Sequence, residues 1–206
     1  MTELVSGIKS RFGSAPTLSA TTPGGLNVVL RTPRFRDADS WRRVRMLNQA
    51  EIEPVWGYSD LSWPDRHRRR DWIRECIDAR KRLRAGSCVH TVVEVDGELA
   101  GQCDAWLERY HKRGEIGVWI DSRWTGQRVG TTALGLLVDY LFAEVGLERV
   151  TAPIALGNIP IVQLTKRLGF AHEGLMRSYL EVGKGRCDHD LYSQTREEWI
   201  AHDGAR

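Results

Sequence analysis

The stretch Trp124-Thr125-Gly126-Gln127-Arg128-Val129-Gly130-Thr131-Thr132-Ala133-Leu134 lies between a strand-like run, residues 117–120, and an apolar helical run, residues 134–145. A strand, a short glycine-containing turn and then a helix form the geometry that points backbone N–H groups at an anion. Gly126 and Gly130 let the backbone approach such a ligand without an intervening Cβ, and Arg128 adds a positive charge. The same residues are equally consistent with a strand-to-helix turn that needs glycine for close packing.

Two familiar phosphate-binding patterns do not match this turn. It has no Gly-Lys-Ser or Gly-Lys-Thr sequence, which excludes a P-loop. The spacing of Gly126, Gly130 and Gly135 also excludes the GxGxxG dinucleotide pattern. If the turn binds an anion, that anion belongs to another kind of ligand.

The bulk composition is typical of a globular, single-domain protein. The 206 residues carry a net charge of only +3, and 41% are hydrophobic and 28% charged. No apolar run approaches the roughly 18 residues of a membrane span, and residues 1–25 lack the sustained apolar stretch of a secretory signal. These features predict a cytoplasmic protein with no membrane contact.

The cysteines and histidines predict no metal site. Cys76, Cys88, Cys103 and Cys187 include no pair at CxxC spacing, and the six histidines show no metal-ligand spacing. Scattered cysteines are typical of reduced, partly buried thiols. Asp188-His189-Asp190 does not predict a metal site or a catalytic triad, because adjacent strand residues point to opposite faces.

Hydrophobic periodicity predicts eleven elements in the order β-α-α-β-β-β-α-β-α-β-β, an α/β chain with a mixed sheet. The expected strands cover residues 27–31, 89–95, 98–109, 114–120 and 150–155, a stretch from residue 170, and residues 190–195; the expected helices cover residues 40–47, 66–84, 127–146 and 158–168. Asp96-Gly97 predicts a two-residue hairpin turn. Residues 1–25 are expected to form a flexible tail and residues 201–206 a short C-terminal tail.

Two further segments place the glycine turn in a family context. The sequence Asn158-Ile159-Pro160-Ile161-Val162-Gln163-Leu164-Thr165-Lys166-Arg167-Leu168-Gly169-Phe170 resembles the asparagine-to-Leu-Gly-Phe segment of the GNAT N-acetyltransferases. Glu115-Ile116-Gly117-Val118-Trp119-Ile120 resembles the family's fourth strand, and the residues around Gly126 resemble its acetyl-CoA pyrophosphate loop. The three segments occur in the family's order and at its distances, and the resemblance covers residues 26–200.

A narrower resemblance is to the RimJ-type ribosomal-protein alanine N-acetyltransferases. It lies in residues 26–36, in Pro54-Val55-Trp56, in residues 179–189 and in Arg196-Glu197-Glu198-Trp199. Aminoglycoside and other small-molecule acetyltransferases share much of this pattern.

The family resemblance implies one domain with a mixed, mostly antiparallel sheet that is splayed between its fourth and fifth strands, with helices on both faces. Acetyl-CoA is the implied cosubstrate, without a metal, and its pantetheine would insert between those two strands. The implied cofactor-binding residues are Val118, Trp119, Ile120, Gly126, Gln127, Arg128, Val129, Gly130, Thr131 and Asn158. The chain departs from the family at Arg128, where glycine is usual, at Ile161, where a small residue is common, and at Thr165, where some relatives place a tyrosine acid.

The resemblance implies direct attack of an amine on the thioester, with no covalent enzyme intermediate. An α-amino group has a pKa of about 7.7–8.0, against about 10.4 for lysine, so a protein N-terminus needs only a modest base. Glu115, at the start of the fourth strand, is the first candidate for this base, the alternative being a solvated strand-end carboxylate. Tyr179 is a candidate donor to the leaving thiolate or a packed aromatic, and Glu181 is a secondary candidate.

The expected function is an acetyl-CoA-dependent N-acetyltransferase, an acyltransferase whose acceptor is the N-terminal α-amine of a protein, above all a ribosomal protein. Two alternatives stay open: acetylation of a small amine such as an antibiotic or a polyamine, and a non-catalytic CoA-binding module. The chain is expected to be a monomer or a homodimer.

Two clusters have both a functional and a structural interpretation. The basic residues of the second helix would contact ribosomal RNA, an acidic substrate or the cofactor 3′-phosphate, or are simply solvated. They are Arg66, Arg68, Arg69, Arg70, Arg74, Arg80, Lys81, Arg82 and Arg84, opposite a predicted buried stripe of Trp72, Ile73, Cys76, Ile77 and Leu83. Trp56, Tyr58 and Trp63 would line the acceptor pocket or pack in the core.

Overall fold

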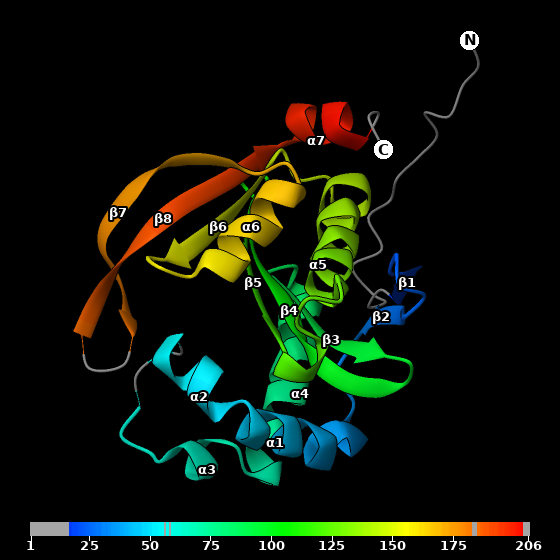
Figure 1. The fold of residues 1–206 in the computed structure, drawn as a ribbon, viewed down its shortest axis with the longest axis vertical. Helices are drawn as coiled ribbons and strands as arrows, with labels where there is room; N and C mark the ends of the chain where they lie inside the picture. The colour runs from blue at the N-terminus through cyan, green and yellow to red at the C-terminus, as the bar shows by residue number, and fades with distance from the viewer. Residues whose placement is uncertain (1–16, 56, 58, 183–184, 204–206) are drawn as a thin grey trace.

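One eight-stranded sheet organises the residues that the structure describes. The computed structural model describes residues 17–55, 57, 59–182 and 185–203. The strands are β1 (Leu18–Thr21), β2 (Asn27–Arg31), β3 (Cys88–Val95), β4 (Glu98–Glu108), β5 (Arg113–Ile120), β6 (Arg149–Ala155), β7 (Ala171–Val182) and β8 (Gly185–Thr195). Their order is β1-β2-β3-β4-β5-β6-β8-β7, and neighbouring strands are antiparallel except β5 and β6 (Figure 1). The expected mixed, mostly antiparallel sheet is confirmed.

The parallel strands β5 and β6 pair at one end only. Their register joins residues 113–115 to residues 149–151 and stops there, while β6 stays paired with β8 as far as Ala155. Beyond Glu115 the two strands diverge (Figure 1). This divergence confirms the expected splay between the fourth and fifth strands, which are β5 and β6 here because β1 precedes them.

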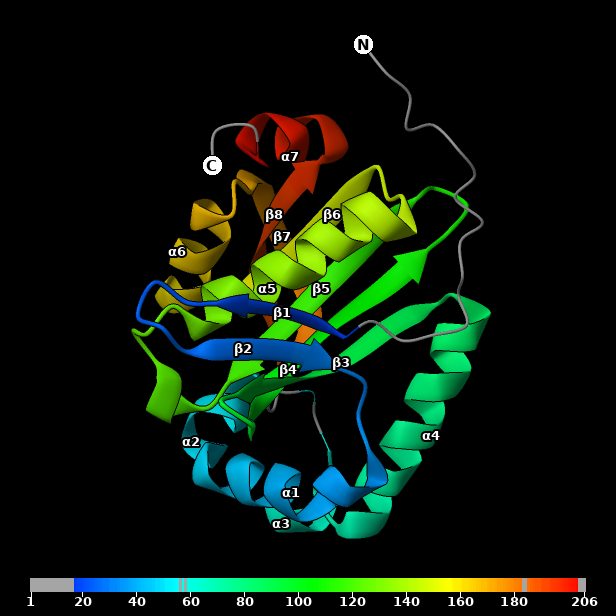
Figure 2. The ribbon, with the colours of Figure 1, turned by 90° about the vertical axis from the view of Figure 1, so that its right-hand side faces the viewer.

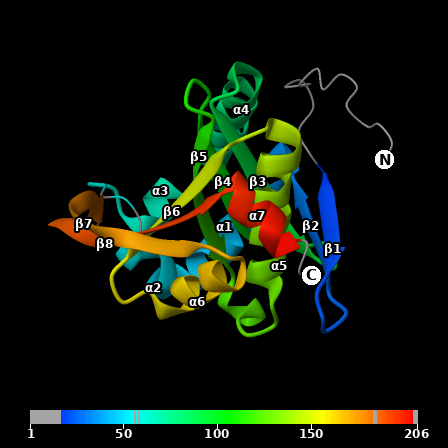
Figure 3. The same ribbon diagram turned by 90° about the horizontal axis from the view of Figure 1, so that it is seen from above.

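Helices cover both faces of the sheet (Figures 2 and 3). One face carries α5 (Val129–Tyr140), which continues into a π-helical turn (Leu141–Val145), and α6 (Ile159–Arg167); the other carries α1 (Ala38–Leu47), α2 (Gln49–Ile52), α3 (Trp63–Arg66) and α4 (Arg69–Ala85). On β5, Ile116 and Val118 pack in the core that contains α5, whereas Trp119 packs with α1 and α4. Since side chains alternate along a strand, Glu115 lies on the same face as Trp119.

The apolar stripe predicted for the long helix after the glycine turn is confirmed. Leu134, Leu137 and Leu141 are buried, and the helix ends at Gly146 in a left-handed conformation. Gly130 lies where α5 packs on α6, because a Cβ at this position would be 3.0 Å from Leu164 Cδ1. Gly130 therefore has a packing role, which agrees with the alternative interpretation of the turn, in which glycine is needed for close packing.

The stripe predicted for α4 is only partly correct. Trp72, Cys76 and Leu83 are buried, but Ile77 is 40% exposed. The buried positions of α4 follow a spacing of three or four residues through Ala79, which makes a narrow stripe. Ile77 lies about 100° around the helix from Cys76 and falls outside it.

Both predicted tails are wrong in part. Residues 18–21 form β1, which pairs with β2, so the predicted flexible tail does not extend through residue 25. β1 has only four residues and lies at the sheet edge, which leaves too short a pattern to identify. At the other end, α7 (Arg196–Asp203) includes residues 201–203 of the predicted C-terminal tail. Residues 1–16 and 204–206 lie outside the described part of the chain.

The described residues also bear on membrane contact and on the thiols. No helix among them has the length and apolar character needed to cross a membrane. Cys76, Cys88, Cys103 and Cys187 are free, and the first three are buried, as the sequence predicted.

We expect Gly101→Ala to destabilise the fold, because β4 and β5 meet closely at this glycine. A Cβ at Gly101 would lie 2.3 Å from the backbone oxygen of Trp119 and 3.0 Å from Ile120 Cδ1. Overpacking of this kind costs about 1–3 kcal/mol, which urea unfolding monitored by circular dichroism can measure. Gly185→Ala is the control, since nothing lies within 4 Å of a Cβ there. Equal stability of the two variants would contradict the close approach of β4 and β5.

Candidate active site

The glycine turn leads from the end of β5 into α5 through two left-handed residues. A 3-10 turn, Ser122–Trp124, follows β5, and then Gly126 has φ = 79° and Arg128 has φ = 64°. No neighbouring atom lies within 4 Å of a Cβ at Gly126, so the backbone angle, and not packing, requires glycine there. Arg128 adopts a conformation that favours glycine, which explains why a family with this turn would usually place glycine at the position.

The beginning of α5 presents backbone donors next to an exposed cation. Arg128 is the N-cap of α5, and its exposed side chain makes no capping hydrogen bond to the helix. The first N–H groups of an α-helix have no partner inside the helix and carry the positive end of its dipole. The turn from Gln127 to Thr131 is therefore placed to bind an anion.

The predicted cofactor-binding residues gather at one end of the sheet. Because β5 and β6 are parallel, residues 118–120 and the end of β6 lie at the same edge, where the strands have diverged. Asn158 follows β6 and caps α6, with its side-chain oxygen accepting the Ile161 N–H at 3.4 Å. The structure thus brings together an unpaired strand edge, the start of α5 and Asn158.

The two predicted catalytic residues are hydrogen-bonded to each other at the other end of the divergence. Glu115 is the last β5 residue that pairs with β6, and its Oε2 accepts a hydrogen bond from the Tyr179 hydroxyl at 2.9 Å. Burial, together with the hydrogen bond to Glu115, raises the pKa of Tyr179 to about 12. Tyr179 is therefore a neutral phenol at physiological pH, and its hydroxyl donates a hydrogen bond to the Glu115 carboxylate.

A cavity of about 500 Å³ surrounds this pair. It is lined by Trp106, Leu107, Glu108, Arg113, Gly114, Glu115, Thr151 and Tyr179. Trp106 is 45% exposed, and its ring lies against Gly117, where a Cβ would be 3.2 Å from the indole. Arg113 forms an ion pair with Glu108, so these two charges compensate each other. The cavity combines an aromatic surface, a neutralised ion pair and the Glu115 carboxylate.

Sequence reasoning missed Trp106, Glu108 and Arg113. The signal that would identify them is the register of β4 and β5, which pairs Trp106 with Glu115 and Glu108 with Arg113. That register follows from the length of the β4–β5 connection, and the sequence provides no turn motif there comparable to Asp96-Gly97.

A buried polar network lies behind β5 on the Glu115 face. The Gln102 side-chain oxygen accepts the indole N–H of Trp119 at 3.0 Å, the indole N–H of Trp41 at 3.2 Å and an Arg45 N–H at 2.8 Å. The Arg45 guanidinium lies 4.3 Å from the Trp119 ring centroid, and burial lowers the pKa of Arg45 to about 10. Arg45 remains cationic at neutral pH, and the network holds the Trp119 side chain in place.

The network continues into His90, which lies between two carboxylates. Its Nε2 is 3.1 Å from Glu75 and its Nδ1 is 2.6 Å from Asp104, while the Gln102 amide donates to Glu75 at 2.8 Å. Burial alone would lower the pKa of His90, but the attraction of Asp104 and the hydrogen bonds raise it to about 12. The two carboxylates are thus balanced by the cations His90 and Arg45, and the buried charges compensate one another.

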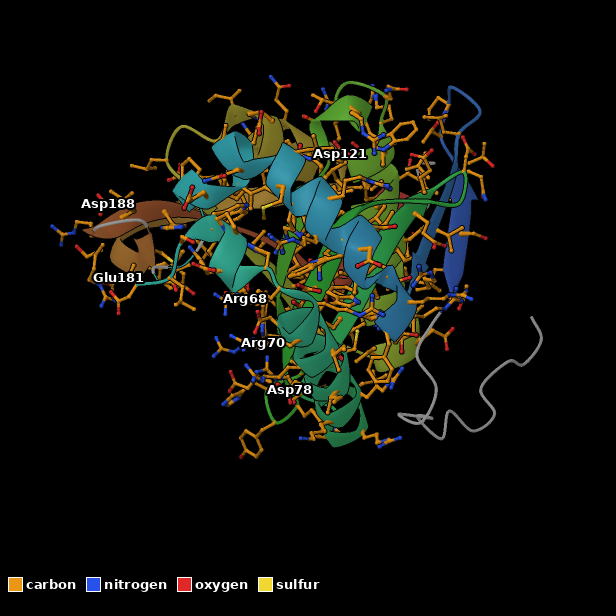
Figure 4. The ribbon with its side chains drawn as sticks, turned by 90° about the horizontal axis from the view of Figure 1, so that it is seen from below. Arg68, Arg70, Asp78, Asp121, Glu181 and Asp188 are labelled. Atoms are coloured by element: carbon orange, nitrogen blue, oxygen red, sulfur yellow. The ribbon has the colours of Figure 1, made fainter. Side chains whose placement is uncertain are left out.

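Several other candidates from the sequence lie outside this site. The Thr165 hydroxyl donates to the carbonyl oxygens of Ile161 and Val162 in its own helix. Glu181 pairs with Arg186 near the outer end of the β7–β8 hairpin (Figure 4). Trp63 is a buried core residue whose indole donates to the Arg45 carbonyl, which is the packing alternative. Trp56 and Tyr58 lie outside the described residues.

The side chains of Asp188, His189 and Asp190 each contact a different partner and do not form a common site. The Asp188 carboxylate accepts the Ser178 N–H, His189 Nδ1 lies 3.1 Å from the Cys187 carbonyl, and Asp190 contacts His172. Within the part of the chain that the structure describes, no three His, Cys, Asp or Glu side chains are placed to hold a metal.

The basic residues of α4 lie on the face of the sheet opposite α5 (Figures 1 and 4). Among them, Arg69, Arg74 and Lys81 lie 3.2–3.8 Å from the acidic residues Asp39, Asp71 and Asp78. They lie on the opposite side of the sheet from the beginning of α5, which argues against contact with the cofactor 3′-phosphate and leaves a solvated face as the simplest interpretation.

The comparisons with known proteins agree with this geometry. Residues 27–171 match the family model described as an acetyltransferase (GNAT) domain. The structure of Mycobacterium smegmatis RimJ in complex with CoA-disulfide is 31% identical, with a TM-score of 0.82 over 91% of this chain and 94% of that chain. The putative ribosomal N-acetyltransferase YdaF of Bacillus subtilis is 28% identical over 84% of this chain and 93% of its own length. The spermidine N(1)-acetyltransferase of Escherichia coli is 31% identical over 46% of this chain and 52% of its own length.

The left-handed conformation of Arg128 leads to a stability prediction. A non-glycine residue in this region costs about 1–2 kcal/mol, part of which is offset by the greater unfolded-state freedom of glycine. Arg128→Gly should therefore have a free energy of unfolding about 0.5–1 kcal/mol higher than Arg128→Ala, measured by urea denaturation. Both variants remove the guanidinium, so their difference reports the backbone alone. A less stable glycine variant would contradict the left-handed assignment.

Proposed function

This chain belongs to the GNAT acetyltransferase family, and we propose that it transfers an acetyl group from acetyl-CoA to the N-terminal α-amine of a protein, with a ribosomal protein as acceptor. The observation that carries the proposal is the divergence of β5 and β6, with the start of α5 at its open end and the Glu115–Tyr179 pair at its closed end. The similarity to RimJ and YdaF supports the choice of a ribosomal-protein acceptor.

Each group of residues at the open end would contact a different part of acetyl-CoA. Backbone amides from Gln127 to Thr131 would hold the pyrophosphate, with Arg128 as an additional cation. The free edge of β5 at residues 118–120 would pair with the amide groups of pantetheine, as a further strand would. Asn158 would contact the pantetheine arm from the opposite side of the opening.

The chemistry needs a neutral amine and a proton acceptor. The amine nitrogen would form a bond to the thioester carbonyl carbon, the carbon–sulfur bond would break with CoA leaving as its thiolate, and the amine proton would pass to Glu115 directly or through water. A backbone N–H on the free edge of β5 would stabilise the oxyanion. Tyr179 would orient Glu115, because its hydroxyl already donates a hydrogen bond to that carboxylate and a phenol with a pKa of about 12 is a weak acid.

The charges of the cavity favour a single amine over a polyamine. Arg113 neutralises Glu108, which leaves Glu115 as the carboxylate available to an incoming amine. A polyamine carries several cations and would be best bound by several uncompensated carboxylates. Trp106 adds an exposed aromatic surface suited to the first residues of a peptide.

An acceptor panel tests the proposed function. We expect CoA release with unblocked peptides that begin with Ala, Ser or Met, and much slower release with N-terminally blocked peptides whose only amine is lysine. Thiol release and isothermal titration with acetyl-CoA are the measurements. Preference for spermidine would support the small-amine alternative, and binding of acetyl-CoA without turnover of any amine would support a non-catalytic module. No binding of acetyl-CoA would reject the proposal.

We expect Glu115→Gln to lower kcat by about 10²–10⁴, the range for loss of a general base, without changing the Kd for acetyl-CoA.

Tyr179→Phe removes one hydrogen bond and should lower kcat by about five- to tenfold. Because the raised pKa of Tyr179 keeps its phenol protonated, this factor should stay constant from pH 7 to 10. Glu108→Gln, in the same cavity, is the control and should mainly change KM. A Tyr179→Phe effect that disappears towards pH 10 would indicate a different role for Tyr179.

A further inference from the structure

Asn48 connects two parts of the molecule that lie far apart in the sequence. It is 1% exposed, and its side-chain oxygen accepts the Ser122 N–H at 2.8 Å. Its amide nitrogen donates to the Asp121 carboxylate at 3.1 Å and to the Val44 carbonyl at 2.9 Å. A buried amide that makes three hydrogen bonds holds both partners firmly, since breaking any bond leaves a buried polar group unpaired.

One of the connected parts is the beginning of the glycine turn. Asp121 is also 1% exposed, its N–H donates to the Ala100 carbonyl on β4, and its carboxylate accepts the Arg123 N–H and Arg123 Nε. Further along, the Gln127 side chain donates to the Arg123 carbonyl. The buried end of the turn is thus anchored through Asp121 and Asn48, while the residues from Thr125 to Arg128 are exposed.

The other connected part is the junction of α1 and α2. Asn48 is the C-cap of α1 and the N-cap of α2, and the Ile52 N–H donates to its carbonyl oxygen. Asp121 lies beside α1 in Figure 4, and α2 extends from this junction towards the β7–β8 hairpin that carries Tyr179 (Figure 1). These helices cover the face of the sheet on which Glu115 lies.

We propose that Asn48 is a positioning residue that couples occupation of the glycine turn by CoA to the position of α1 and α2 on the acceptor side. The coupling rests on the proposed function, because it needs CoA in the turn. A ligand that binds the exposed turn reduces the conformational freedom of the turn. Helices that are hydrogen-bonded to the anchored end of the turn then lose less conformational entropy when an acceptor orders them. Asn48 provides that bond through Ser122 and Asp121.

The first test uses CoA alone and needs no acceptor. Amide hydrogen exchange is measured with and without saturating CoA in the native chain, Asn48→Ala and Arg42→Ala. In the native chain, CoA should slow exchange both over residues 121–132 and over residues 41–55. In Asn48→Ala, CoA should slow exchange over residues 121–132 only, and its Kd should rise roughly tenfold, as expected for lost hydrogen bonds.

Arg42→Ala is the matched control. Arg42 lies on α1 and donates to the carbonyl oxygens of Pro64 and His67, so the variant also removes two hydrogen bonds from this helix without reaching the turn. It should keep the native response over both segments. If Asn48→Ala does not fold, Asn48→Leu keeps the approximate size of the side chain but removes its bonds to both Ser122 and Asp121, and should give the same loss of coupling.

The outcomes separate this inference from the proposed function. Slowed exchange over residues 41–55 that persists in a folded Asn48 variant would overturn the inference, as would a native chain in which CoA protects residues 121–132 alone. Both of these results leave the proposed function intact. A native chain that shows no CoA protection over residues 121–132 and no CoA binding would overturn both proposals.

Discussion

The candidate site depends on how early the parallel pairing of β5 and β6 stops. Three residues of each strand are paired, and the strands then diverge after Glu115 and Thr151. Pairing in this short region fixes the Glu115 carboxylate next to Tyr179, and divergence leaves a free backbone edge on β5. Longer pairing would satisfy that edge and close the opening, so the free edge of β5 and the placement of the Glu115–Tyr179 pair both follow from one constraint.

The divergence is held open by two separate cores. On one face, Ile116 and Val118 of β5 pack in the core with α5, and β6 packs into the same core through Ile154. On the other face, Trp119 is fixed by Gln102 and Arg45 within a buried network whose charges compensate each other. Since an uncompensated buried charge is costly, the balance of Arg45 and His90 against Glu75 and Asp104 makes this polar support possible. β5 is therefore packed on both faces although its edge towards β6 is unpaired beyond Glu115.

The sequence predicted what depends on local pattern and missed what depends on distant contacts. Asp96-Gly97 identified the β3–β4 hairpin because a two-residue turn needs both residues in left-handed conformations, which the structure has. The turn from Gly126 to Gly130 was likewise found from a local pattern, a glycine-containing turn between a strand and a helix, together with the family resemblance. In contrast, the Asn48–Asp121 bond spans 73 residues and the Tyr179–Glu115 bond 64, and no spacing rule connects residues so far apart. Glu115 and Tyr179 were each named as separate candidates within the family resemblance, but the contact between them was not predicted.

The departures from the family pattern affect the proposed chemistry to different degrees. Thr165, where some relatives place a tyrosine acid, donates its hydroxyl to the backbone of α6, and Tyr179 is bound to Glu115. The cavity therefore holds the Glu115 carboxylate, which we propose as the base, in a defined position beside a weakly acidic phenol. A thiol such as that of cysteine has a pKa of about 8.5, so a thiolate can leave without first being protonated, whereas a protonated amine cannot attack at all. In the proposed reaction, deprotonating the amine is the step that needs help from the protein, and Glu115 is the group that we propose for it.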